Sequence, residues 1–303
     1  IFCVFLIRNR YRLTYKEIRS RLELEKSKTL IELQKEEVDE KNQEIISSLR
    51  YAKRLQEALL PPRNLLESFF KDNYFILYQP RDIVSGDFYW ARKIKTTPRE
   101  GKSKEFLLVA VADCTGHGVP GAFMSLLGSN FLHQSAVEKD VNTPAQALDF
   151  LNQKIITTLN HGYGEEKIRD GMDISFIAID METRQLAYSG ANNPIYVVRN
   201  KTLETLKANK QAIGNMNDDV LPFDNVTTQL HEGDCVYLFT DGYADQFGGP
   251  KGKKLMRKQF EEVLIANSEK TMQEQKQALE NTYNNWKGDL EQVDDVCVIG
   301  IRV

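Results

Sequence analysis

The chain has 303 residues, of which 41% are hydrophobic and 27% charged, so it can bury one sizeable core and is not disordered overall. Its formal net charge is only −3, and this near balance argues against nucleic acid as a partner, because nucleic-acid-binding domains are strongly basic. The four cysteines stand far apart without zinc-ligand spacing, so we interpret them as reduced, mostly buried thiols of a cytosolic protein.

The first seven residues, IFCVFLI, are wholly apolar, and a cluster of basic residues follows them. Seven residues cannot span a bilayer, but an apolar end followed by a basic cluster is typical of the inner edge of a membrane helix. We therefore expect residues 1–10 to be the remnant of a transmembrane helix and its basic flank. The remainder would then be the cytoplasmic domain of a protein anchored in the inner membrane. An apolar patch that merely begins an ordinary helix is the alternative.

Residues 11–60 contain no Gly and no Pro, and strong helix formers dominate, which predicts one long signalling helix. An apolar residue recurs at every seventh position, as in a coiled coil: Leu24, Ile31, Val38, Ile45, Ala52 and Leu59. The positions three residues further on are mostly polar. We therefore expect a homodimer that is held loosely through this helix. Pro61 and Pro62 end the helix, and residues 61–73 form the expected linker.

Residues 74–303 read as one domain of short apolar strands and helices. Strands are expected at 74–80, 85–94, 106–114, 172–180, 184–191, 194–200, 226–233, 234–242 and 295–303. Helices are expected at about 120–137, 144–159, 254–264 and 271–284, with Thr143 as the N-cap of the second. The expected order is strands, two helices, strands, two helices and a last strand. This order predicts an α+β layered fold.

Several predicted strands begin or end at aspartate: Asp87, Asp113, Asp241, and the adjacent Asp294 and Asp295. Each could be an ordinary turn residue. However, VAVAD and YLFTD place a carboxylate directly after a run that must be buried, and a metal ion can compensate such a charge. Two Mg²⁺ or Mn²⁺ ions held by carboxylates can bind a phosphoryl group and activate water. No Walker A loop, GxSxG turn or HExxH motif is present.

The segments SGDFYW, VADCTGHGVPGAFMS, DGMDISFIAID, FTDGYADQ and DDVCVIGIRV, in this order, resemble the SpoIIE-like branch of the bacterial metal-dependent (PPM, type 2C) serine/threonine phosphatases. The likeness runs from about Tyr74 to the C-terminus, and RYAKRLQEALLPP resembles that branch's linker to its regulatory region. The resemblance implies a four-layer α-β-β-α sandwich of two antiparallel sheets, with two Mn²⁺ or Mg²⁺ ions at one end.

The resemblance also implies how the metals are held. Asp113 would bridge both ions, with Asp87 and the main-chain carbonyl of Cys114 completing one shell, and Asp241 and Asp294 binding the other ion. Asp295 is the second choice for the position of Asp294. Water activated by the metals would attack phosphorus directly, without a phosphoenzyme.

Four further residues have two interpretations each. His117, in GHG, is either the general acid for the serine leaving group or a residue that caps the turn. Arg81 is either a phosphate ligand or a solvated arginine, because it stands six positions before Asp87 and the family's arginine stands closer. Asp170 and Asp173 either contact a third, weaker metal ion or are turn residues.

The resemblance implies a phosphatase that hydrolyses phosphoserine or phosphothreonine on a regulatory protein, of the anti-sigma factor antagonist kind, under the control of the coiled coil. Two alternatives remain. One is a catalytically silent phosphatase-fold module that only binds a partner, although none of the expected carboxylates is missing. The other is a two-metal phosphodiesterase or nuclease, against which the lack of a basic groove counts.

Overall fold

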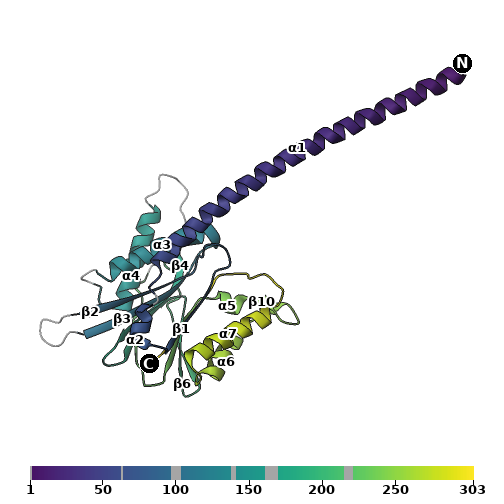
Figure 1. Ribbon diagram of the computed structural model, residues 1–303. Helices are drawn as coiled ribbons and strands as arrows, with labels where there is room; N and C mark the ends of the chain where they lie inside the picture. The colour runs from purple at the N-terminus through teal and green to yellow at the C-terminus, as the bar shows by residue number, and fades with distance from the viewer. Residues whose placement is uncertain (1, 63, 97–103, 138–140, 161–169, 215–220) are drawn as a thin grey trace. The chain divides into compact units, whose positions relative to one another are not determined.

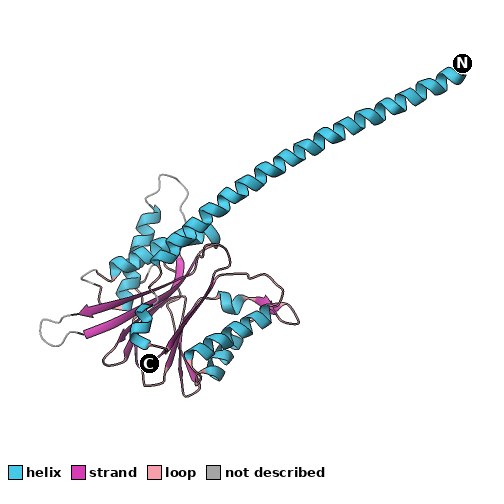
Figure 2. Cartoon of the chain, in the orientation of Figure 1, coloured by secondary structure: helices cyan, strands magenta, loops and turns pink. Residues whose placement is uncertain are grey.

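The computed structural model describes residues 2–62, 64–96, 104–137, 141–160, 170–214 and 221–303. The chain divides into two compact units, Ile1–Tyr51 and Ala52–Val303, which we describe separately. Figure 1 shows the course of the chain, and Figure 2 shows its helices and strands.

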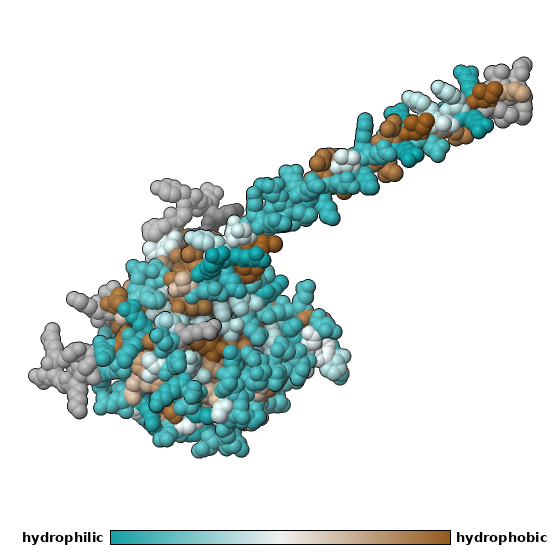
Figure 3. All heavy atoms as spheres, viewed as in Figure 1, coloured by the Kyte–Doolittle hydropathy of each residue, from teal (hydrophilic) through white to brown (hydrophobic). Residues whose placement is uncertain are grey.

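The first unit belongs to a single helix, α1 (Phe2–Leu59), whose last residues, from Ala52 onward, lie in the second unit. The predicted long helix is therefore present and begins nine residues earlier than expected, within the segment predicted as a membrane remnant. The seam residues Leu24, Ile31, Val38 and Ile45 are all more than half exposed, and Figure 3 shows apolar side chains along this helix. The coiled-coil dimer stays a prediction.

We also searched the helices for membrane spans. Within the part of the chain that the structure describes, no helix has the length and apolar character needed to cross a membrane. The membrane remnant assigned to residues 1–10, and with it the inner-membrane location, stays a prediction.

The second unit contains two five-stranded antiparallel sheets. One sheet has the order β1 (Tyr74–Gln79), β12 (Val296–Arg302), β9 (Cys235–Phe239), β6 (Ile195–Arg199) and β7 (Thr202–Leu206). The other has the order β2 (Phe88–Thr96), β3 (Lys104–Cys114), β4 (Met172–Asp180), β5 (Gln185–Ala191) and β8 (Val226–Gln229). A small hairpin joins β10 (Phe247–Gly248) to β11 (Lys253–Lys254).

Helices cover the outer face of each sheet, which completes the predicted four-layer α-β-β-α sandwich (Figure 2). Helices α3 (Gly118–Ser135) and α4 (Pro144–Asn160) pack on the β2-β3-β4-β5-β8 sheet, and α6 (Arg257–Asn267) and α7 (Met272–Lys287) pack on the other. A third apolar core, which includes Val109, Ile177 and Val236, fills the space between the sheets. Continuous apolar runs such as CVYLF form strands that are buried on both faces, as expected for inner layers.

The structure adds elements that the sequence pattern did not predict. Helix α2 (Asn64–Phe70) lies within the expected linker and buries Leu66 and Phe70, strand β7 follows β6, and α5 (Gly242–Asp245) is a single turn. Helix α6 begins at Arg257, three residues after the predicted start, because Lys253 and Lys254 pair with β10. Thr271 caps α7 in a capping box with Glu274.

Candidate metal centre

Four of the predicted aspartates lie at the strand ends where the two sheets meet. Asp87 directly precedes β2, and Asp113 is the penultimate residue of β3, which pairs with β2 so that Phe88 faces Ala112. Asp241 follows β9, and Asp294 precedes β12, the antiparallel neighbour of β9. Antiparallel pairing therefore places each pair of aspartates at one end of its own sheet.

The electrostatics show that the two pairs also lie close to each other. Burial, together with smaller contributions from the carboxylates of Asp87, Asp241 and Asp294, raises the pKa of Asp113 to about 10. Burial also raises the pKa of Asp294, and the nearby Asp241 contributes. Carboxylates that raise one another's pKa from two different sheets form one acidic cluster.

Asp87 is the most deeply buried member of this cluster. Its side chain is only 2% exposed, and burial raises its pKa well above the ordinary value, with a smaller increase from Asp295 and a partial offset by a hydrogen bond from Thr240. Its Oδ2 atom is buried and has no hydrogen-bond partner. A buried carboxylate oxygen without a partner is costly unless a cation compensates it, so the cluster fits a divalent metal.

The carboxylates are not packed into a closed ligand shell. Among the described residues, no group of three or more His, Cys, Asp or Glu side chains has the geometry of a preformed metal site. This does not conflict with the electrostatics, because Mg²⁺ keeps several water ligands, so the protein side chains need not form a closed shell. The orphaned oxygen of Asp87 is a specific unsatisfied atom that a cation would satisfy.

The turn from β3 to α3 brings the backbone close to Asp87. Gly116 adopts φ +78°, and a Cβ atom on Gly86 would lie 2.6 Å from the carbonyl oxygen of Gly116 and 3.4 Å from that of Cys114. The carbonyl of Cys114 therefore lies close to the SGD segment, and its role as a metal ligand stays a prediction. The Cys114 side chain is buried, as are Cys235 and Cys297, which agrees with our interpretation of these three residues as buried thiols.

His117 is the N-cap residue of α3, but its side chain makes no capping hydrogen bond. Instead, its Nδ1 atom lies 2.9 Å from Oδ2 of Asp82, and the imidazole is half exposed. The ring is also close enough to Asp294 to act against the increase in that residue's pKa. The second interpretation of His117, a side chain that caps the turn, therefore has no support in the geometry.

The other predicted site residues surround the cluster. Arg81 donates from Nη1 to the carbonyl of Val293, so its guanidinium lies beside the DD motif. Asp173 faces Asp113 directly across the β3–β4 ladder and accepts a hydrogen bond from Asn192. Burial raises the pKa of Asp173. Asp170, which stands two residues before β4, has its Oδ1 atom 3.5 Å from the hydroxyl of Thr115, which follows β3.

Two residues near the centre were not predicted from the sequence. Asp82, which pairs with His117, had only the signal of a polar residue in a turn. Gln56, near the C-terminal end of α1, is 6% exposed and is hydrogen-bonded to the backbone of Ser85 at two atoms. Its Oε1 accepts from the Ser85 amide, and its Nε2 donates to the Ser85 carbonyl and to the Ser125 hydroxyl. A lone glutamine in a polar helix carries no pattern that marks it as buried.

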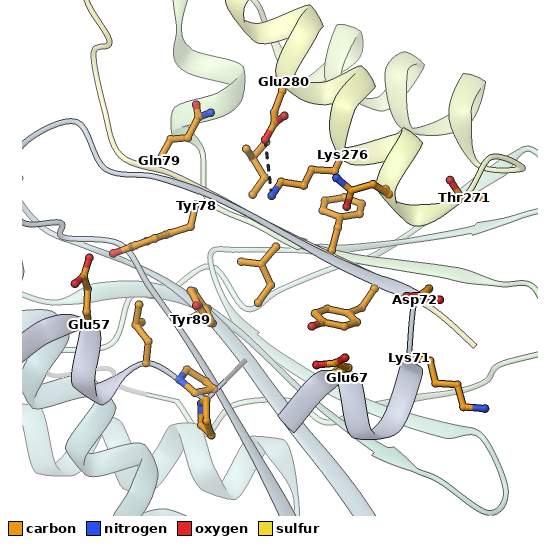
Figure 4. A pocket seen from close by; sticks show the side chains of 18 of the residues that line it. Glu57, Glu67, Lys71, Asp72, Tyr78, Gln79, Tyr89, Thr271, Lys276 and Glu280 are labelled. Atoms are coloured by element: carbon orange, nitrogen blue, oxygen red, sulfur yellow. Dashed lines mark ion pairs between the residues drawn. The ribbon is translucent and has the colours of Figure 1, made fainter. Parts of the chain in front are cut away.

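A groove of about 1420 Å³ runs beside β1. Figure 4 shows Glu57 and Glu67 on one side of it and α7, with the ion pair between Lys276 and Glu280, on the other. Of the described residues that line this groove, none belongs to the candidate metal centre. The groove is therefore a separate feature.

Comparison with known proteins supports a phosphatase. The family model described as Stage II sporulation protein E (SpoIIE) matches residues 103–303. Phosphoserine phosphatase RsbU of Bacillus subtilis (strain 168) is 27% identical over 210 residues. That match covers 67% of this chain and 55% of RsbU, so the chain spans about half the length of this curated relative.

Solved structures show the same fold. The SiaA-PP2C domain of Pseudomonas aeruginosa is 31% identical, with a TM-score of 0.75, over 86% of this chain and 98% of that domain. The PP2C phosphatase domain of SpoIIE from Bacillus subtilis, solved with a fragment of its regulatory domain, is 19% identical. Its TM-score is 0.56 over 76% of this chain and 61% of that one, which shows the fold alone. This chain belongs to the SpoIIE family and contains a PP2C-type protein phosphatase domain.

Proposed function

We propose that the chain is a metal-dependent serine/threonine phosphatase that acts on a phosphorylated regulatory protein. The observation that carries the proposal is the convergence of Asp87, Asp113, Asp241 and Asp294 at one end of the sandwich, with Oδ2 of Asp87 buried and unpartnered. Family membership makes phosphate ester hydrolysis the expected reaction.

Two Mn²⁺ or Mg²⁺ ions would be held by these four carboxylates and the Cys114 carbonyl. When bound, the ions supply the positive charge that lowers the pKa of water and offsets the charge of the phosphoryl group. The protein contributes a fixed arrangement of oxygen ligands at the edge of a buried core, because each ligand is attached to a strand end or to a glycine-rich turn.

His117 supplies the proton for the leaving group in this proposal. A carboxylate only accepts hydrogen bonds, so the imidazole Nδ1–H donates to Asp82, which holds the ring in one orientation. Nε2 is then the nitrogen that gives its proton to the seryl oxygen as the phosphorus–oxygen bond breaks. Arg81, which borders the cluster beside Val293, is the candidate phosphate ligand.

The substrate and the assembly are also proposals. The name of RsbU, a phosphoserine phosphatase, supports phosphoserine as the substrate residue, and the resemblance supports a regulatory protein of the anti-sigma factor antagonist kind. The exposed heptad seam of α1 supports a homodimer through that helix.

The proposal is tested by comparing two ester classes in the presence of Mn²⁺: a phosphoserine peptide and bis(p-nitrophenyl) phosphate. We expect the full chain to release phosphate from the peptide and to cleave the diester at least about a hundredfold more slowly. The reason is that the proposed centre would bind the terminal phosphoryl group of a monoester, which a diester lacks. Preference for the diester would indicate a phosphodiesterase. Cleavage of neither ester, with Mn²⁺ shown to be bound, would indicate a catalytically silent module.

A further inference from the structure

The carboxylate of Asp295 bridges the two ends of the loop that directly precedes Asp87. Asp295 is 2% exposed, and its two oxygens accept hydrogen bonds from two different backbone amides. Oδ1 accepts from the Arg81 amide at 2.7 Å, and Oδ2 accepts from the Gly86 amide at 2.8 Å. These amides stand at the two ends of the segment 81–86, and the next residue is Asp87. One side chain therefore fixes where this loop begins and ends.

The backbone of Asp295 contacts the other half of the cluster. Its amide donates to Oδ1 of Asp294 at 2.9 Å, which fixes the orientation of that carboxylate. Its carbonyl lies so close to Gly242 that a Cβ atom at that position would collide with it. Asp295 therefore contacts Asp294 directly. It also contacts Gly86 and Gly242, which are the chain neighbours of Asp87 and Asp241.

We infer that Asp295 is a positioning residue that sets the spacing of Asp87, Asp241 and Asp294, and that it is not itself a metal ligand. The inference rests on the proposed metal centre. It also chooses between the two adjacent aspartates, because both oxygens of Asp295 accept from amides, whereas only one oxygen of Asp294, Oδ1, accepts a hydrogen bond among the described residues.

The chemistry explains why an aspartate is needed at this position. Two backbone N–H groups converge on one side chain, and only a carboxylate offers two acceptor oxygens without a donor. In Asp295→Asn, the side-chain NH₂ group would face one of the two backbone amides. That buried amide N–H would then have no hydrogen-bond acceptor. The loop would then open at one end, and the position of Asp87 would no longer be fixed.

The test measures hydrogen–deuterium exchange of the segment 80–88 in the full chain after treatment with a chelator, for the wild type, Asp295→Asn and Asp294→Asn. We expect Asp295→Asn to increase exchange in this segment at least about tenfold, because a buried charge-assisted hydrogen bond is lost. Asp294→Asn should leave the segment protected and should weaken Mn²⁺ binding in calorimetry.

Unchanged exchange in Asp295→Asn would overturn the inference. If that variant does not fold, the wild type alone decides: a positioning residue keeps the segment protected without metal, whereas a ligand would lose protection at least about tenfold when Mn²⁺ is removed. Failure of this inference can be distinguished from failure of the proposed phosphatase function, because hydrogen–deuterium exchange is measured without substrate. A chain with no phosphatase activity would still show this protection.

Discussion

Asp113 and Asp241 come from different sheets, yet Asp241 is among the carboxylates that raise the pKa of Asp113. Each is assigned to a metal, and Asp113 to both metals. Replacing either with asparagine keeps the size of the side chain and removes the charge. We expect Asp113→Asn and Asp241→Asn each to reduce phosphate release at least about a hundredfold at saturating Mn²⁺, because a metal left under-coordinated activates water less well.

Asp72→Asn is the matched control, since Asp72 is an exposed carboxylate that lines the separate groove beside β1. This variant should retain the wild-type rate. Circular dichroism and melting temperature should be measured for all three variants, so that a loss of activity is not confused with unfolding. Near wild-type rates in both site variants would refute the ligand assignment.

At the level of single residues, the sequence predicted candidates better than it predicted their roles. Asp87, Asp113 and Asp241 were predicted because each stands beside an apolar run, and a carboxylate at the end of a buried strand needs compensation. The choice between Asp294 and Asp295 could not be made from the sequence, because adjacent residues of the same type give the same signal. Their different hydrogen bonds support our inference that Asp294 is the ligand and Asp295 the positioning residue.

At the level of elements, the end of α1 is attached to the loop that precedes Asp87. Gln56 makes three hydrogen bonds to Ser85 and Ser125, and Ser85 stands two residues before Asp87. We expect Gln56→Ala to lower the free energy of unfolding by about 1–3 kcal/mol, since the buried Ser85 amide loses its partner. We also expect weaker Mn²⁺ binding, because the loop that holds Asp87 is less constrained.

The control for this variant is Gln43→Ala, at an exposed position of the same helix. Urea unfolding can be followed through the fluorescence of tryptophan, since Trp90 is fully buried. A Gln56→Ala protein with the stability and Mn²⁺ affinity of the wild type would show that this contact does not support the metal centre.

The heptad seam of α1 leads to a second prediction at this scale. Ile31→Glu places a charge on the seam, whereas Leu33→Glu makes the same kind of change at another exposed apolar position of the helix. We expect the first variant to be monomeric and the second to remain dimeric, because a buried charge without a partner destabilises a coiled-coil core. Light scattering measures the molar mass, and phosphate release is measured in parallel.

If the seam variant is monomeric but keeps the wild-type rate, the coiled coil is a tether and does not control the enzyme. If it remains dimeric, the seam assignment itself is wrong. A monomer with an altered rate would support control through the helix.

The sequence predicts the helices and strands whose hydrophobic pattern is strong, and it does not predict those whose pattern is weak. The two sheets and the covering helices follow from apolar runs and helix formers, which are local signals. The sequence predicts a linker where α2 forms, because seven residues after two prolines are too few to show a helical repeat. Strand β7, with the sequence TLETL, was missed because only one of its residues is buried, so its pairing with β6 is decided by tertiary contacts.

At the scale of the whole molecule, residues distant in the sequence make one acidic cluster because two sheets end at the same place. Asp87 and Asp113 come from one sheet, and Asp241 and Asp294 come from the other. The proposed cation site therefore depends on the fold, because no single motif contains all of its carboxylates.

The most direct test of this account is phosphate release from a phosphoserine peptide by the full chain, first stripped with EDTA and then titrated with Mn²⁺. We predict no release above background in the stripped protein, with metal removal confirmed by elemental analysis, and recovery of turnover as Mn²⁺ is added, because the metals activate the attacking water. Undiminished phosphate release from the metal-free protein would contradict the account.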